Sequence, residues 1–144
     1  VSDDGTMDTN PAVIYRNGKA AVAWVDANKT FTENDTSFDK LNSLGISVAV
    51  YENGTFNKEM TLVDDGFFNF APQLNIVGDK LYCSYMKRDI SDVKTEEGLL
   101  DLTATYSTMA YVKCDIPTRT VENEEFITVQ HPILTDPYTA SISE

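Results

Sequence analysis

Two acidic turns carry most of the side chains in this chain that could bind a ligand. The motif Asp-Asp-Gly occurs at residues 3–5 and again at residues 64–66. Asp3, Asp4 and Asp8 could together hold Ca²⁺, which prefers six to eight oxygen ligands, although their spacing does not match an EF-hand. The alternative is a structural turn, in which aspartate side chains accept hydrogen bonds from backbone amides and glycine supplies a positive φ.

The second turn differs from the first because aromatic side chains occupy some of its polar positions. Phe67 and Phe68 follow it directly, and Asn69 stands where the first copy has Asp8. This difference favours the structural turn over a metal site. The candidate binding residues from both turns are Asp3, Asp4, Asp8, Asp64, Asp65, Phe67, Phe68 and Asn69.

No catalytic residue is predicted. The single histidine, His131, has no clustered Cys or His partner of the kind that zinc sites or nucleophilic triads use, and it is expected in a loop. Asp64 and Asp65 could act as acid and base in glycoside cleavage. Adjacent carboxylates on an exposed loop, however, rarely have the two different environments that such a reaction needs.

The two turns belong to a longer internal repeat. A constant shift of 61 residues places Pro11 on Pro72 and Lys19 on Lys80, as well as one acidic turn on the other. A sustained period of this length is typical of repeat proteins. Within one domain spanning 1–144, we predict repeat 1 over about 3–63, repeat 2 over about 64–129 and the start of a third over about 136–144.

Each repeat is predicted to form four short antiparallel strands. They are expected at 12–15, 20–25, 47–52 and 59–63 in the first repeat, and at 73–77, 81–86, 109–114 and 125–129 in the second. Val, Ile, Tyr, Phe and Thr dominate these runs, and Asn17-Gly18 and Asn53-Gly54 suit two-residue hairpin turns. The predicted fold class is all-β, with two four-stranded antiparallel β-propeller-like blades plus the first strand of a third.

Long connections separate the second and third strands of each repeat. In residues 27–45, Thr36 and Ser37 suit a helix start and Gly45 a helix stop, which predicts one or two helical turns. In residues 87–106, the alternation of Leu100, Leu102, Ala104 and Tyr106 predicts that the third strand extends backwards. In a propeller blade these connections and the acidic turns emerge on one face, where binding sites usually lie.

The charge and the apolar content of the chain exclude some classes of binding partner. The chain has 23 acidic and 11 basic residues and a formal net charge of −12, which argues against nucleic acid and against anionic membrane surfaces. No stretch of about 18 apolar residues is present, so membrane insertion is not expected.

Cys83 and Cys114 are predicted to be free thiols, because the hairpin register places Cys83 opposite about residue 111.

With four strands per repeat, the chain resembles the β-propeller superfamily and is similar to repeats of large secreted bacterial surface proteins. The resemblance rests on the pattern of strands, since no Trp-Asp dipeptide, kelch double glycine or sialidase-type Asp box is present. It implies a non-catalytic binding or scaffolding segment, extracellular or at the cell surface, with carbohydrate or protein as partner. The alternative is a fragment of a carbohydrate-active propeller enzyme, sialidase-like or another glycosidase, whose catalytic residues lie largely outside this chain.

Two blades do not close a ring, because propellers typically contain about 4–8. The sequence is therefore expected either to be an excerpt whose remaining blades belong to a longer parent chain, or to assemble as a homo-oligomer through its open blade edges.

Overall fold

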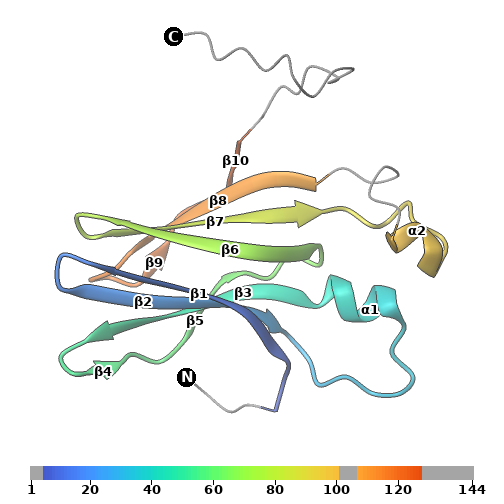
Figure 1. Cartoon of the computed structure of the whole chain (residues 1–144), viewed down its shortest axis with the longest axis horizontal. Helices are drawn as coiled ribbons and strands as arrows, with labels where there is room; N and C mark the ends of the chain where they lie inside the picture. Colours follow the sequence, from blue (N-terminus) through green and yellow to red (C-terminus); the bar gives the residue numbers. More distant parts are fainter. Residues whose placement is uncertain (1–4, 101–106, 128–144) are drawn as a thin grey trace, which may run out of the picture.

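Figure 1 shows the computed structural model of the chain, which describes residues 5–100 and 107–127. Two antiparallel sheets account for most of these residues, so the predicted all-β class is confirmed. The first sheet consists of β1 (Asp8–Arg16), β2 (Lys19–Ala27), β3 (Leu44–Glu52), β4 (Thr55–Phe56) and β5 (Met60–Val63). The second consists of β6 (Phe68–Val77), β7 (Lys80–Arg88), β8 (Ser107–Asp115), β9 (Thr120–Val121) and β10 (Glu125–Ile127).

The four main strands of each sheet follow the same order. In the first sheet β1 pairs with β2, β2 with β3 and β3 with β5, and the second sheet repeats this order as β6, β7, β8 and β10. The short β4 and β9 continue the hairpins that leave β3 and β8. The predicted four-stranded repeats are thus present, whereas the predicted strand at about 136–144 lies outside the described residues.

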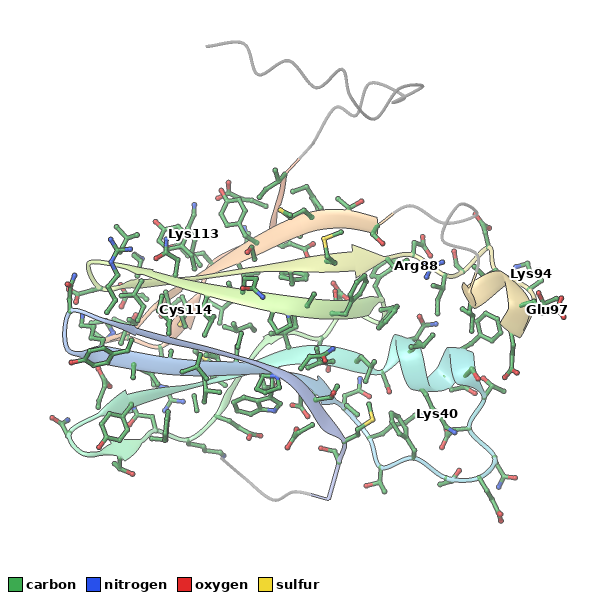
Figure 2. The ribbon with its side chains drawn as sticks, viewed as in Figure 1. Lys40, Arg88, Lys94, Glu97, Lys113 and Cys114 are labelled. Atoms are coloured by element: carbon green, nitrogen blue, oxygen red, sulfur yellow. The ribbon has the colours of Figure 1, made fainter. Side chains whose placement is uncertain are left out.

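The two sheets stack as layers around one core (Figure 1). Figure 2 shows Cys114 between the sheets and Lys113 on the outer side of the second sheet, as the alternation of side chains along a strand requires. The core includes Ala21, Ala23, Ile46, Val48 and Val50 from the first sheet, and Leu81, Cys83, Tyr85, Ala110 and Val112 from the second. Burial of each large apolar side chain contributes about 1.5–3 kcal/mol.

The sheets bury opposite faces of the repeat. The 61-residue shift places Tyr82 and Ser84 on the buried Ala21 and Ala23, yet these two residues lie on the outer face of the second sheet. The face of the second sheet that carries Cys83 and Tyr85 therefore packs against the face of the first sheet that carries Ala21 and Ala23. We call the two packed faces inner and the two remaining faces outer.

The first strand of each sheet begins earlier than the sequence predicted. The register shifts between Thr9 and Ala12 in β1 and at the equivalent place in β6. The bulges place Asn10 and Ala71 at φ values of 51° and 53°, directly before the two equivalent prolines. Proline lacks an amide donor and is tolerated at bulges, so strand pairing resumes on the far side of it. Asp8, Phe68 and Asn69, predicted in loops, therefore lie in strands.

The predicted hairpin turns are confirmed. Asn17 and Gly18 have φ values of 52° and 80°, and Asn53 and Gly54 have φ values of 52° and 87°. A pair of positive φ values is the geometry whose twist matches that of the strands it joins.

The connection after β2 contains the predicted helical turns as α1 (Ser37–Asn42). Thr36 caps its start by accepting a hydrogen bond from the Asp39 amide, and the Asp39 carboxylate accepts one from the Thr36 amide. The prediction that Gly45 ends the helix was wrong. Ser43 is the C-cap, and Gly45 belongs to β3, where its missing side chain leaves room for β5.

The connection after β7 departs from its prediction. Leu100, the first residue expected to extend the third strand backwards, instead ends the short helix α2 (Glu96–Leu100), and β8 is described over Ser107–Asp115. Residues 101–106 lie outside the described part of the chain. Arg88, labelled in Figure 2, donates a hydrogen bond to the Leu99 carbonyl and so joins the end of β7 to this helix.

Both cysteines are free and buried, as predicted. Cys83 pairs in register with Val112, and Cys114 with Leu81, so the two thiols are not partners across the strands. Burial raises the pKa of Cys83 to about 12 and also raises the pKa of Cys114.

We therefore expect alkylation of Cys83 in the folded chain at about pH 8 to be about 10³-fold slower than that of an exposed thiol, and alkylation of Cys114 to be slowed as well, since the thiolate is the reactive form. Mass spectrometry after iodoacetamide treatment, with and without denaturant, measures this difference. Rapid labelling of two thiols in the folded chain would contradict the buried assignment.

Candidate functional site

The two long connections and the second acidic turn meet at one end of the sheets, as predicted for these three segments. Of the first acidic turn, Asp3 and Asp4 lie outside the described residues. Figure 1 shows α1 and α2 together at this end. Ser37 donates a hydrogen bond to Glu96 at 2.7 Å, which joins the two connections. Asn28 donates to Asp64 at 2.8 Å, which joins the first connection to the second acidic turn. These contacts place the second acidic turn, residues 64–66, over the end of the second sheet.

Lys87, near the end of β7, is the centre of a charged cluster there. Its ammonium lies 3.0 Å from Glu124 Oε2 and also forms an ion pair with Asp65. Tyr85 donates a hydrogen bond to the same Glu124 carboxylate. The side chain of Lys87 is only 13% exposed, and those of Asp65 and Glu124 are 28% and 22% exposed. Partial burial strengthens such pairs relative to fully solvated ones.

Two aromatic rings flank the same ammonium group. Lys87 Nζ lies 4.6 Å from the centre of the Phe67 ring and 5.5 Å from that of Phe126. Both distances are within the range of cation–π attraction. The Lys87 ammonium thus contacts one ring from the second acidic turn and one from β10.

The cluster shifts the pKa values of its members in directions that favour the charged pair. Burial lowers the pKa of Lys87, but hydrogen bonds to Asp65 and Glu124 raise it more, so the net pKa is raised. Burial raises the pKa of Asp65, but hydrogen bonds from Lys87, Asn69 and the Phe67 amide lower it more. The pKa of Tyr85 is raised well above its usual range by burial and by Glu124.

Asn69 holds the second acidic turn in place through side-chain hydrogen bonds. Its side chain is fully buried, and Nδ2 donates to Asp65 Oδ1 at 2.9 Å, to the Phe67 carbonyl at 3.1 Å and to the Leu44 carbonyl at 3.2 Å. The Phe67 amide also donates to Asp65 Oδ1, at 3.1 Å. Asp65 therefore acts as the turn aspartate that the sequence suggested as the alternative to a metal ligand.

A groove opens beside the charged cluster. It has a volume of about 300 Å³ and is lined by Phe67, Lys87, Asp89, Thr108 and Phe126. Its two aromatic rings and its lysine, carboxylate and hydroxyl groups combine apolar contact area with hydrogen-bonding groups, the mixture typical of small-molecule sites. A groove of about 370 Å³ on the outer face of the second sheet is larger but has no charged lining residue.

The structure brings together only some of the predicted binding residues. Asp65 and Phe67 belong to the cluster and Asn69 supports it, whereas Asp64 bonds Asn28 beside it. Phe68 instead packs against the buried group of Val25, Ala27 and Leu44. Asp8 lies at the start of β1 and lines a different groove, on the outer face of the first sheet.

The predicted calcium site at Asp3, Asp4 and Asp8 stays a prediction, because residues 3 and 4 lie outside the described part of the chain. Among the described residues, no group of three or more His, Cys, Asp or Glu side chains is placed to hold a metal ion.

Sequence reasoning missed Lys87, Glu124, Tyr85 and Phe126. The repeat pointed away from Lys87, because the 61-residue shift places it on Asp26, a residue of opposite charge. The only available signal was that Glu124 directly precedes the strand predicted at 125–129 and that Phe126 lies near its start, which is weak by itself.

The charged cluster predicts how stability depends on pH. Above about pH 10 the unfolded chain releases protons that folded Lys87 and Tyr85 retain, so the free energy of unfolding should fall. Below about pH 4 the unfolded chain binds a proton that Asp65 does not bind in the folded chain, so the free energy of unfolding should fall there too. Urea titrations across this range measure both losses.

Lys87→Met should reduce the alkaline loss and lower the free energy of unfolding at neutral pH by about 1–2 kcal/mol. Lys58→Met, at an exposed lysine, is the control. A profile that Lys87→Met leaves unchanged would contradict the role given to the cluster.

No protein-family model matches the chain, and no curated protein matches its sequence. No helix among the described residues is long and apolar enough to cross a membrane.

Proposed function

We propose that this chain is a non-catalytic binding segment of a β-propeller protein, extracellular or at the cell surface, and that it binds carbohydrate in the groove beside Lys87. The observation that carries the proposal is the pair of rings, Phe67 and Phe126, which lie within cation–π distance of the partly buried Lys87 ammonium group and line the groove with it.

Carbohydrate suits this groove because a sugar presents apolar C–H faces and hydroxyl groups at the same time. The two rings offer flat apolar surface, and Asp89 and Thr108 offer polar groups to hydroxyls. Lys87 is already paired with two carboxylates, and the chain has a net charge of −12. A neutral or cationic glycan therefore fits better than an anionic one.

The chemistry of the carboxylates favours binding over turnover. Glycoside cleavage needs one carboxyl group with a raised pKa as general acid and a second in its ionised form. Asp65 has a lowered pKa and bonds Lys87, Asn69 and the Phe67 amide, which suits a structural role. The alternative proposal is a fragment of a carbohydrate-active propeller enzyme whose catalytic residues lie largely outside this chain.

A screen of neutral, cationic and anionic glycans tests the proposal. Saturable binding without products supports a binding segment, and product formation supports the enzyme alternative. Phe126→Ala should weaken binding of a positive glycan about tenfold, because it removes one stacking surface of about 1.4 kcal/mol. Phe56→Ala, at another exposed phenylalanine, is the control and should leave affinity unchanged. Equal affinity in the two variants would exclude this groove.

A further inference from the structure

The contact between the two sheets is made by two different faces of one repeating unit. The first sheet contributes the face that includes Ala21 and Ala23, and the second contributes the face that includes Cys83 and Tyr85. Because the 61-residue shift relates the sheets, each outer face corresponds to an inner face of the other sheet. The two outer faces are therefore equivalent to the two inner faces that pack together in the core. Among the described residues, no other sheet packs against either outer face.

The outer face of the first sheet corresponds to the buried face of the second. It bears a groove of about 280 Å³, lined by Asp8, Thr9, Pro11, Val22 and Trp24. The shift places these five residues on Asn69, Phe70, Pro72, Cys83 and Tyr85, all of which are buried or half-buried. In the first sheet itself, Asp8 and Pro11 are exposed, Thr9 and Val22 are half-buried and Trp24 is buried.

In β1, the edge strand of the first sheet, exposed residues of the outer face also correspond to buried residues of the second sheet. Val13 and Tyr15 of β1 are each 75% exposed, which is unusual for large apolar side chains in a sheet. Their equivalents in β6 are Leu74 and Ile76, which pack in the core between the sheets. The residue types at these positions therefore suit a covered face, and they are not covered by the described residues.

The outer face of the second sheet corresponds to the buried face of the first. Its groove of about 370 Å³ is lined by Gln73, Asn75, Tyr82, Ser84, Tyr111 and Ile127, among others. Tyr82, Ser84 and Tyr111 are the equivalents of the core residues Ala21, Ala23 and Val50. Neither groove presents a cluster of like charges that would oppose contact between the two outer faces.

We propose that the outer face of the first sheet binds the outer face of the second sheet in a second copy of this chain, in head-to-tail fashion. The contact repeats the one already present between the two sheets. Association therefore takes place through sheet faces rather than through the open edges expected from the sequence. A contact of this type uses two different surfaces, so it adds further copies and forms a ring where the rotation closes.

Light scattering over a concentration series tests this proposal with two double variants. Val13→Lys with Tyr15→Lys alters the outer face of the first sheet, and Val77→Lys with Met109→Lys alters that of the second. All four side chains are at least 40% exposed, so folding should be preserved, which circular dichroism verifies. Glu33→Gln with Asn34→Lys adds the same charge in an exposed loop and is the control.

The unaltered chain and the control should show a mass above 16.0 kDa that rises with concentration. Each face variant alone should remain at 16.0 kDa, because it has lost one half of the contact. An equimolar mixture of the two variants should give a dimer of twice that mass and nothing larger, since one intact face remains on each partner.

An unaltered chain that stays at 16.0 kDa at every concentration would overturn the proposal. Self-association that survives in one face variant, or a mixture that remains monomeric, would also overturn it, because the contact would then not be head-to-tail. The masses are measured without glycan, and the Lys87 groove uses other residues. A negative result for self-association therefore does not contradict the proposed carbohydrate site. A negative result for glycan binding likewise does not contradict the proposed contact between copies.

Discussion

Asn69→Asp is expected to lower the free energy of unfolding by about 3–5 kcal/mol at about pH 7. The substitution keeps the shape of the side chain but replaces its only donor, Nδ2, by an acceptor. Nδ2 donates to three acceptors: Asp65 Oδ1, the Phe67 carbonyl and the Leu44 carbonyl. A fully buried carboxylate at this place would face three acceptors, one of them on a charged group.

The pH dependence of this effect distinguishes charge repulsion from a simple loss of packing. Burial near Asp65 should raise the pKa of the new carboxyl group. The folded variant then binds a proton that the unfolded variant releases, so its deficit should be smaller at about pH 5 than at about pH 7.

Asn69→Leu is the matched variant, with similar volume and no titrating group. Its deficit should be smaller and equal at the two pH values. Urea denaturation of the three proteins gives the comparison, and an Asn69→Asp deficit that does not change with pH would contradict the hydrogen bonds assigned to Nδ2.

Gly45→Ala is expected to lower the free energy of unfolding by about 2–4 kcal/mol. A Cβ atom on Gly45 would lie 2.3 Å from the Val63 carbonyl oxygen, 3.4 Å from its carbon and 3.6 Å from the Asp64 Cα atom. All three are backbone atoms, so no side-chain rotation relieves the clash. β5 must move away from β3, and the acidic turn that follows β5 must move with it.

Gly98→Ala is the control for this substitution. There the new Cβ would approach the end of the Val93 side chain at 3.0 Å, inside a short helix that alanine favours over glycine. Chemical denaturation should show little change. Because Gly45 also positions Asp65, Gly45→Ala should weaken glycan binding in the folded fraction, whereas Gly98→Ala should not. Equal stability of the two variants would contradict the close approach of β3 and β5.

The strands and tight turns were predictable because their signals are local. Asn-Gly pairs accept two positive φ values wherever they occur, and the Thr36–Asp39 pair caps a helix through atoms only three residues apart. The predictions failed where a contact with a distant part of the chain decides the structure. Gly45 has the residue type of a helix stop, but its function is to admit another strand, which no neighbouring residue indicates.

The candidate site was predicted only in part for a related reason. Asp65 and Phe67 belong to a turn motif that is visible in the chain, whereas their partner Lys87 lies 22 residues from Asp65 and 37 from Glu124. Nothing in the sequence near Lys87 indicates either carboxylate. Only the pairing of β7 with β6 and β8, together with that of β8 with β10, brings the three groups together.

By itself, the sequence determined that the chain forms eight main strands in two similar units, because turn chemistry and strand propensity act between neighbouring residues. Only the tertiary structure decided which face of each unit is buried and which charges meet. Both faces of these strands carry apolar residues, so alternation alone does not select one. The choice is made when one sheet stacks on the other and excludes water from between them.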